Sequence, residues 1–298
     1  MKQVELGSLY SSHEQRGVNL LRDKFYDQEI TQDIESLFSQ ASSLNDKINL
    51  LKSNDKSLWN IIAKKLKVDW TYHSNSIEGS TLTLGETFFF ISEGLTVEGK
   101  PFKDFLDAKN HIEAIDYLYE LISNKRDISE YVLKEINSLL LSGVSYTIAQ
   151  NSQGEKVKKR LASGEYKKQA NHVLQADGTI HWYVDPMNVK DQMEELITWV
   201  NDKINKLHPL YVAAVAHYNL VRIHAFDDGN GRGARIFMNL ILLKNGFFPV
   251  VVRNEKKRMY LESLSKADKG DLMPFISFIS TELIETYENV IRDLTSRA

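Results

Sequence analysis

Cysteine is absent from this chain of 298 residues. Its absence excludes a disulfide framework, a zinc site built on thiolates and a cysteine nucleophile. The chain also has no run of about 18 apolar residues, which a membrane-spanning helix requires. Residues 1–17 lack the apolar segment of a secretory signal peptide. We therefore expect a soluble, cytoplasmic protein that has no membrane partner.

The chain has no large surplus of charge of either sign. Its 37 Lys and Arg residues nearly balance 40 Asp and Glu residues, so the net charge at pH 7 is −3. Nucleic acid bound mainly through phosphate contacts is therefore not expected as a partner, although a local basic patch is compatible with this balance. Apolar residues make up 42% and charged residues 26%, which excludes a disordered or collagen-like chain.

Prolines are also few, and each of the five lies where a periodic apolar pattern starts or stops. Long helices are therefore expected. Thr83 and Glu86 form a capping box that begins one of them, and we expect the next three phenylalanines, 88–90, to fill the core. Gly79 is placed to end the helix before it. Helical spacing of apolar residues predicts the others over 29–53, 55–78, 102–123, 130–142, 186–205, 210–224, 231–244, 256–268 and 272–295.

Residues 145–184 do not follow the helical pattern. Within them, Asp177-Gly178 separates residues 172–176 from residues 179–183, and this dipeptide between two alternating segments is a strong signal for a β-hairpin. The predicted fold class is therefore mainly α, a helical bundle that carries one small β-hairpin. We expect an N-terminal helical region (1–99), a core (100–250) and a C-terminal helical extension (251–298).

The segment 224–235, with the sequence HAFDDGNGRGAR, contains groups that suit phosphate chemistry. Its glycine-rich loop, 229–231, precedes a helix, and the backbone N–H groups of such a loop and helix end form an anion site. Arg232 and Arg235 are about one helical turn apart, so both guanidinium groups can reach anionic oxygens at that helix end.

Two further side chains of the segment are suited to catalysis. Asp228 places a carboxylate beside the anion site, and Mg²⁺ prefers one carboxylate together with phosphate oxygens and water. His224, at the end of a helix rich in Ala and Val, is a titratable base within reach of the same loop. A base, a metal ligand, an anion site and two arginines together indicate phosphoryl or nucleotidyl transfer from a polyphosphate.

Each of these elements alone has a simpler interpretation, such as a core histidine, a solvated aspartate pair or an ordinary Gly-Asn-Gly turn. Three better-known motifs do not fit. The Gly-x-Gly-x-x-Ala run at 229–234 follows a helical pattern instead of a strand, which argues against a dinucleotide turn. Arg232 occupies a ligand position of an EF-hand, and no closing Glu follows. The Gly-Lys-Ser/Thr of a P-loop does not occur.

The same segment resembles the signature of the Fic family, His-x-Phe-x-Asp/Glu-Gly-Asn-Gly-Arg-x-x-Arg, with every fixed position present. The resemblance covers roughly residues 100–280 and implies a Fic-type helical bundle whose core is the region 100–250. Fic proteins mostly transfer AMP from ATP to a Ser, Thr or Tyr hydroxyl of a target protein. The resemblance therefore implies a protein adenylyltransferase with ATP as co-substrate and Mg²⁺ as cofactor.

The resemblance assigns a role to each matched residue. His224 would take the proton of the hydroxyl, Asp228 would hold Mg²⁺ between the α- and β-phosphates, and Phe226 would pack under the loop. Gly229 favours AMP transfer, since the branch of the family that phosphorylates carries Lys there. The phosphate-binding residues would be Gly229, Asn230, Gly231, Arg232 and Arg235, with Asn230 on the α-, Arg232 on the β- and Arg235 on the γ-phosphate.

A second motif, Ser74 to Gly79 with the sequence SNSIEG, resembles the family's inhibitory motif Ser/Thr-x-x-x-Glu-Gly/Asn. Ser74 and Glu78 are one turn apart at the end of the 55–78 helix and share a face. If Glu78 pairs with Arg235, it takes the place of the γ-phosphate, and ATP binds only in an unproductive pose. The resemblance also allows removal of AMP from a modified target with the help of the same Glu.

The predicted hairpin resembles the flap with which Fic proteins pair with an extended stretch of their target. The implied partner is a target protein with a hydroxyl side chain, and a homodimer is compatible with the family. The residues expected to dock the target are His172, Val173, Leu174, Thr179, Ile180 and His181.

Two alternative functions are compatible with the same residues. The anion site could sense nucleotide in a non-catalytic, ATP-binding regulatory module. The enzyme could also transfer a different nucleotide group, such as UMP.

Overall fold

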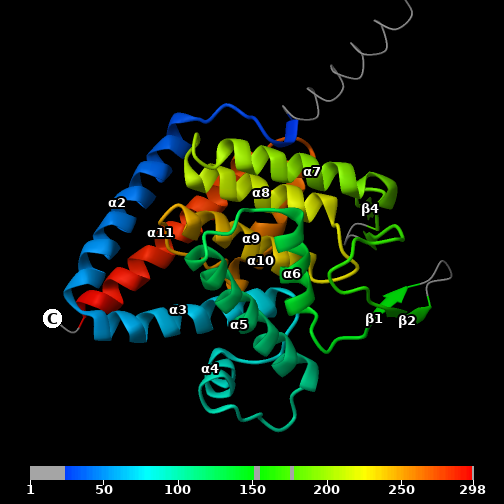
Figure 1. Ribbon diagram of the computed structural model, residues 1–298, viewed down its shortest axis with the longest axis horizontal. Helices are drawn as coiled ribbons and strands as arrows, with labels where there is room; N and C mark the ends of the chain where they lie inside the picture. The colour runs from blue at the N-terminus through cyan, green and yellow to red at the C-terminus, as the bar shows by residue number, and fades with distance from the viewer. Residues whose placement is uncertain (1–23, 151–154, 175–177, 297–298) are drawn as a thin grey trace, which may run out of the picture.

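The computed structural model describes residues 24–150, 155–174 and 178–296. A helical bundle forms most of this part of the chain, and two short hairpins extend from one end of it (Figure 1). Every helix expected from the sequence is present, with ends within a few residues of those predicted. None of the described helices combines the length and apolarity needed to cross a bilayer. The α-helices are α2 (Gln32–Asn54), α3 (Lys56–Ile77), α4 (Leu84–Glu93), α5 (Phe102–Ser123), α6 (Glu130–Leu140), α7 (Pro186–Lys203), α8 (Pro209–Ile223), α9 (Asn230–Lys244), α10 (Lys257–Asp268) and α11 (Met273–Thr295).

Local side-chain chemistry sets the ends of these helices. The Thr83 hydroxyl accepts a hydrogen bond from the Glu86 N–H at 3.2 Å, and the Glu86 carboxylate accepts one from the Thr83 N–H at 2.8 Å, which confirms the capping box of α4. Helix α7 begins with Asp185 as its N-cap and Pro186 in its first turn. Gly79 follows α3 with a φ of 99°, a conformation that favours glycine and ends the helix.

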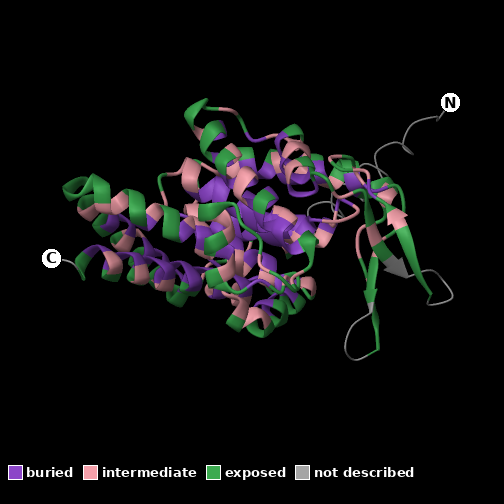
Figure 2. Ribbon diagram, turned by 90° about the horizontal axis from the view of Figure 1, so that it is seen from below, coloured by how far each residue is buried: buried purple, intermediate pink, exposed green. Residues whose placement is uncertain are grey.

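Helix α8 lies in the centre of the bundle. Every residue from 210 to 220 is buried, polar side chains included. A helix buried on all sides needs neighbours all round, and α7, α9 and α11 pack against it. Figure 2 shows the buried residues gathered along the middle of the bundle. Since α8 and α9 flank the expected site, the loop that joins them is held by the most deeply buried helices of the molecule.

The strands form two separate antiparallel hairpins. The predicted hairpin is confirmed, since β3 (His172–Leu174) pairs with β4 (Ile180–Trp182); residues 175–177 of its turn lie outside the described part. The expectation of a single hairpin was wrong, because β1 (Tyr146–Gln150) pairs with β2 (Lys156–Arg160) in another one. Strand β2 reads KVKKR, and its four cations hide the alternation of apolar and polar residues by which a strand is identified.

The expectation that the three phenylalanines of α4 fill the core was wrong for two of them. Phe88 is 56% exposed and Phe89 40% exposed. Phe90 packs inwards, with its ring centroid 5.2 Å from that of Phe105 in a small apolar cluster beside the main core. Helix α4 lies at the edge of the bundle against α3 and α5, so only one of its sides is covered (Figure 1).

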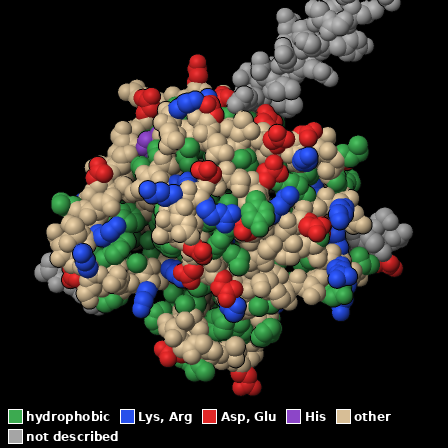
Figure 3. All heavy atoms as spheres, in the orientation of Figure 1, with side chains coloured by type: hydrophobic (Ala, Val, Ile, Leu, Met, Phe, Trp, Pro, Cys, Tyr) green, Lys and Arg blue, Asp and Glu red, His purple; other side chains and the backbone are tan. Residues whose placement is uncertain are grey.

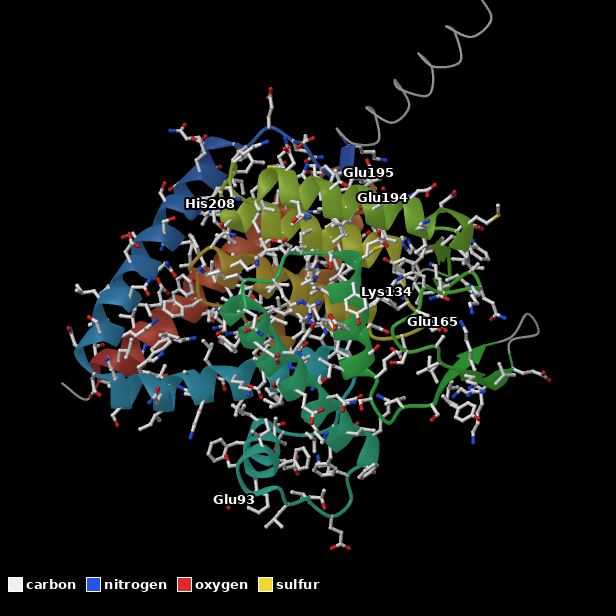
Figure 4. The ribbon with its side chains drawn as sticks, in the orientation of Figure 1. Glu93, Lys134, Glu165, Glu194, Glu195 and His208 are labelled. Carbon is white, nitrogen blue, oxygen red and sulfur yellow. The ribbon has the colours of Figure 1, made fainter. Side chains whose placement is uncertain are left out.

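His208 links α2 to the start of α8 (Figure 4). Its ring stacks on Phe38 with centroids 4.4 Å apart. Its Nδ1 accepts a hydrogen bond from the Leu210 N–H at 3.3 Å and so caps α8, a role that only an unprotonated Nδ1 can fill. Burial lowers the pKa of His208 to about 4. Burial also lowers the pKa values of His111 and His217, which lie inside the core.

We expect the free energy of unfolding to fall as the pH drops from about 6.5 toward 4. The unfolded chain binds a proton at the ordinary histidine pKa of about 6.5, whereas folded His208 binds one only near pH 4, so acid favours the unfolded state within that window. Replacing this side chain in His208→Asn keeps an N-cap but removes the titration. Urea unfolding at several pH values gives the slope of the free energy of unfolding against pH, which measures the protons taken up on unfolding. Between pH 4 and 6.5, this uptake should be smaller by up to about one proton in the variant than in the wild type. The same slope of unfolding free energy against pH in both proteins would contradict the lowered pKa of His208.

Candidate active site

The site lies where α8 ends and the loop to α9 begins. His224 caps the C-terminus of α8 with a φ of 51°, and its N–H donates to the Leu220 carbonyl at 3.1 Å. A left-handed conformation is uncommon for residues other than glycine, and at an active site it can hold a functional group in place. This turn ends α8 and places the imidazole beside the glycine-rich loop.

Asn230 fixes the shape of the loop. Its side-chain oxygen accepts a hydrogen bond from the Phe226 N–H at 2.9 Å, and its side-chain amide donates to the Phe226 carbonyl at 2.8 Å. Phe226 is buried beneath the loop, as the sequence predicts. Because the Asn230 side chain is engaged in this way, its backbone N–H is the group that remains to face an anion.

The first turn of α9 has the geometry of an anion site. Gly229 is its N-cap with a φ of 77°, and no side chain caps the helix. The first N–H groups of an uncapped helix have no partner within the helix and carry its positive end. A Cβ added to Gly231 would lie 2.5 Å from Oε1 of Glu78, so a carboxylate lies directly against this turn.

Glu78 and Arg235 form the ion pair that the sequence predicts. Arg235 is 2% exposed, and its Nη2 lies 2.6 Å from Oε1 of Glu78. The same guanidinium donates to the hydroxyl of Ser74 at 3.0 Å and to its carbonyl at 2.9 Å. Burial raises the pKa of Glu78, but the charge and hydrogen bond of Arg235 outweigh it, so the net shift is downward. Glu78 is therefore ionised at neutral pH. The end of α3 supplies two partners of Arg235, and Tyr260 of α10 supplies a third hydrogen bond.

Arg232 is held from α5 by a residue that the sequence analysis missed. Its Nη1 lies 2.8 Å from Oδ1 of Asp107, and the side chains of the two residues are 4% and 8% exposed. Lys103 contacts the other oxygen of Asp107. A signal was present in the sequence, because Asp104, Asp107 and Asn110 recur at helical spacing and all prove to be buried.

Asp228 lies beside the anion site with one third of its side chain exposed. Its Oδ1 accepts a hydrogen bond from the Gly229 N–H at 2.6 Å and lies 3.9 Å from Nη2 of Arg232. The described residues contain no group of three His, Asp or Glu side chains that could hold a metal by themselves. One carboxylate next to an anion site suits Mg²⁺, which is commonly held by one protein carboxylate together with phosphate oxygens and water.

The imidazole of His224 is covered by Tyr183, another residue that the sequence analysis missed. The two rings stack with centroids 3.7 Å apart and planes 17° apart. Burial, with the charge of Lys167 second, lowers the pKa of His224 to about 3. The ring is therefore neutral at physiological pH and can accept a proton. Tyr183 directly follows β4, so the predicted flap lies against this base.

The flap residues lie mostly on the surface beside the site. Val173 is 45% and Ile180 50% exposed, and His172 and Thr179 are exposed as well. His181 is partly covered, with its Nδ1 3.9 Å from a carboxylate oxygen of Asp268 in α10. The side chain of Leu174 lies outside the described part.

We expect the buried pair of Asp107 and Arg232 to respond strongly to loss of one partner. Replacing the carboxylate in Asp107→Leu removes the nearer of the two carboxylates beside a buried guanidinium, with Asp228 left at 3.9 Å, and should lower the free energy of unfolding by about 3–5 kcal/mol. The double variant with Arg232→Met should recover most of this loss. The exposed carboxylate of Asp116 on the same helix pairs with Lys67, and Asp116→Leu should cost less than about 1 kcal/mol. Equal losses at both aspartates, measured by urea unfolding, would contradict this expectation.

A further expectation concerns the protonation of His224. In histidine NMR spectra assigned with a His224→Asn variant, its imidazole should stay neutral from pH 8 down to about pH 5, because its pKa lies near 3. The structure indicates that this ring is removed from water. A titration of the ring with a midpoint near pH 6.5 would contradict that.

Comparison with known proteins places this geometry in a family. Residues 127–242 match the Fic/DOC family. A protein adenylyltransferase Fic from Nematostella vectensis is 34% identical over 211 residues, which are 70% of this chain and 45% of that protein. The protein adenylyltransferase fic-1 from Caenorhabditis elegans is 31% identical over 214 residues, which are 71% of this chain and 38% of that protein. The chain thus spans less than half the length of these two curated relatives.

Solved structures give the same result. A Fic domain containing signaling protein from Bacteroides thetaiotaomicron superposes with a TM-score of 0.76 at 28% identity, over 86% of this chain and 97% of that one. Residues 134–508 of Fic-1 from C. elegans superpose with a TM-score of 0.70 at 26% identity, over 87% of this chain and 71% of that one. The chain belongs to the Fic/DOC family.

Proposed function

We propose that this chain is a protein adenylyltransferase, which transfers AMP from Mg·ATP to a Ser, Thr or Tyr hydroxyl of a target protein and is inhibited by Glu78. The observation that carries the proposal is the carboxylate of Glu78 on Arg235, at the uncapped N-terminus of α9. A site that already holds one anion beside a neutral imidazole suits a polyphosphate substrate. The relatives named protein adenylyltransferase support this choice of reaction.

The proposed reaction is one displacement at phosphorus. The hydroxyl oxygen of the target attacks the α-phosphorus of ATP, and the bond from this atom to the oxygen that bridges to the β-phosphate breaks. His224 takes the hydroxyl proton, and pyrophosphate leaves. The N–H groups of residues 230–232 and the guanidinium of Arg232 would face the negative oxygens, where fixed donors stabilise developing charge, while the Gly229 N–H holds the Asp228 carboxylate beside them. Mg²⁺ bound through Asp228 would neutralise charge on the leaving group.

Inhibition follows from the position of Glu78. A phosphate group brought to Arg235 would meet the carboxylate at contact distance, since Oε1 lies 2.6 Å from Nη2. Two negative charges about 4 Å apart repel by about 1 kcal/mol in water and by about 4 kcal/mol near a protein surface. The γ-phosphate and Glu78 therefore compete for the same guanidinium, and ATP that loses this contact is not aligned for attack.

The flap would bring the target to the base. Among the described residues, strands β3 and β4 form a two-stranded sheet, in which each strand has one edge without a neighbouring strand. An extended segment of a target can pair with such an edge through main-chain hydrogen bonds. Tyr183 connects β4 with the imidazole of His224, so a target paired with the flap would lie next to the base.

We expect Glu78→Gly to raise the rate of Mg·ATP-dependent AMP labelling about tenfold or more, because removal of a repulsion of roughly 1.4 kcal/mol corresponds to a factor of ten. In that background, His224→Ala should lower the rate at least about 100-fold, as is typical for loss of a general base. Labelling would be measured with ATP radioactive at the α-phosphorus and confirmed by the mass of an added AMP.

The matched control is Glu93→Gly. Glu93 ends α4 directly before Gly94, as Glu78 precedes Gly79 at the end of α3, and both glycines have positive φ. Glu93 is exposed and lies on α4, away from the site (Figure 4). Its replacement should leave labelling unchanged. Nucleotide binding without any adduct in the Glu78 variant would instead favour the non-catalytic ATP-binding module, and a stronger signal with labelled UTP would favour transfer of UMP.

A further inference from the structure

The hairpin of β1 and β2 carries a basic face, which we define as Lys156, Lys158, Arg160, Tyr146 and Ile148. In the antiparallel register, Tyr146 lies opposite Arg160 and Ile148 lies opposite Lys158. Alternate residues of a strand point to the same side of the sheet, and directly opposed residues share that side. Three cations and two large apolar side chains therefore form one surface.

This basic face is open to solvent. Tyr146 is 57% and Ile148 62% exposed, and the three cations are exposed as well. Lys can also protect the edge of a small sheet from aggregation. That role accounts for the cations but not for an aromatic and a β-branched side chain exposed between them.

The opposite side of the hairpin is fixed to the catalytic loop. Nζ of Lys159 lies 2.7 Å from Oδ1 of Asp227, the residue before the proposed Mg²⁺ ligand Asp228. The other oxygen of Asp227 accepts a hydrogen bond from the Ala162 N–H at 3.5 Å. The Leu161 N–H donates to the Ser145 carbonyl at 3.0 Å and closes the base of the hairpin. These contacts fix the position of the hairpin, and so of its basic face, relative to the loop that would bind ATP.

Both hairpins lie at the same end of the molecule. Figures 1 and 2 show β1 and β2 extending beside β3 and β4, away from the helical bundle. Figure 3 shows Lys and Arg side chains gathered along the edge of the molecule where β1 and β2 lie. The hairpin of β1 and β2 therefore lies at the end of the molecule where a target bound to the flap would lie.

We propose that the basic face docks an acidic segment of the target protein, in which carboxylates alternate with apolar side chains. The proposal rests on the proposed function, because it identifies the docked protein as the one that is modified. A strand of five residues is about 17 Å long, so the segment recognised is of similar length. The apolar side chains between the cations favour a polypeptide over a nucleic acid, as does the net charge of −3.

Binding can be tested without ATP. The probe is a fluorescent peptide in which glutamate alternates with leucine. Its binding is measured by the rise in fluorescence anisotropy. We compare it with a peptide that carries glutamine in place of glutamate and with a short oligothymidylate. The wild-type protein should bind the glutamate peptide more tightly than either of the others, and added salt should weaken this binding.

The variant that removes the surface is Lys156→Glu, Lys158→Glu and Arg160→Glu together. It should bind the glutamate peptide at least about tenfold more weakly. Its control reverses three exposed lysines on α2 and α3, as Lys47→Glu, Lys56→Glu and Lys64→Glu. This control has the same change of net charge and should bind as the wild type does. A second variant with glutamine at the three hairpin positions weakens binding without charge reversal, in case reversal unfolds the hairpin.

Transfer assays separate failure of this inference from failure of the proposed function. In the Glu78→Gly background, a glutamate peptide extended by a threonine should accept AMP, and the hairpin variants should lower its kcat/KM without changing self-labelling. The proposed docking surface would be wrong if the hairpin variants bound the glutamate peptide as tightly as the wild type does. It would also be wrong if the wild type bound the oligonucleotide more tightly than the peptide. Peptide binding as expected with no AMP transfer to any acceptor would instead overturn the proposed function.

Discussion

The structure depends on one buried guanidinium. Arg235 lies on α9, is 2% exposed, and is hydrogen-bonded to Ser74 and Glu78 at the end of α3 and to Tyr260 of α10. A buried charge is stable only when it is paired and hydrogen-bonded. Glu78, Ser74 and Tyr260 together meet this requirement. The arrangement that we propose to be inhibited is therefore also one that satisfies the buried charge. Displacement of Glu78 would need another anion, and the γ-phosphate of ATP has the right charge for this.

Helices α8 and α9 bring the imidazole of His224 and the anion site together, and Tyr183 beside the flap covers the imidazole. Helices α8 and α9 set the distance between the imidazole of His224 and the anion site, because both are buried along most of their length. Tyr183 covers the imidazole from the flap side. Glu78 at the end of α3 contacts α9 through Arg235, and the flap contacts His224 through Tyr183. The inhibition and the target presentation that we propose would therefore both act at the loop between α8 and α9.

Much of this arrangement could be predicted from the sequence. The helices follow from apolar periodicity and caps, and the pair of Glu78 and Arg235 follows from the two Fic motifs. Asp107 and Tyr183 could not be placed, because their partners are more than 40 residues away along the chain and only tertiary packing brings them close. Strand β2 was missed since its charges have no periodicity, and Phe88 was misplaced because a short edge helix leaves one side uncovered.

The central claim is that Glu78 occupies the place of the γ-phosphate on Arg235. Calorimetric titration of the wild type and Glu78→Gly with Mg·ATP and with Mg·ADP tests it most directly, because ADP has no γ-phosphate. The account predicts that the substitution tightens ATP binding about tenfold or more, as removal of a repulsion of roughly 1.4 kcal/mol requires, while ADP binding changes less than about twofold. Equal changes for both nucleotides, or no change for ATP, would contradict it.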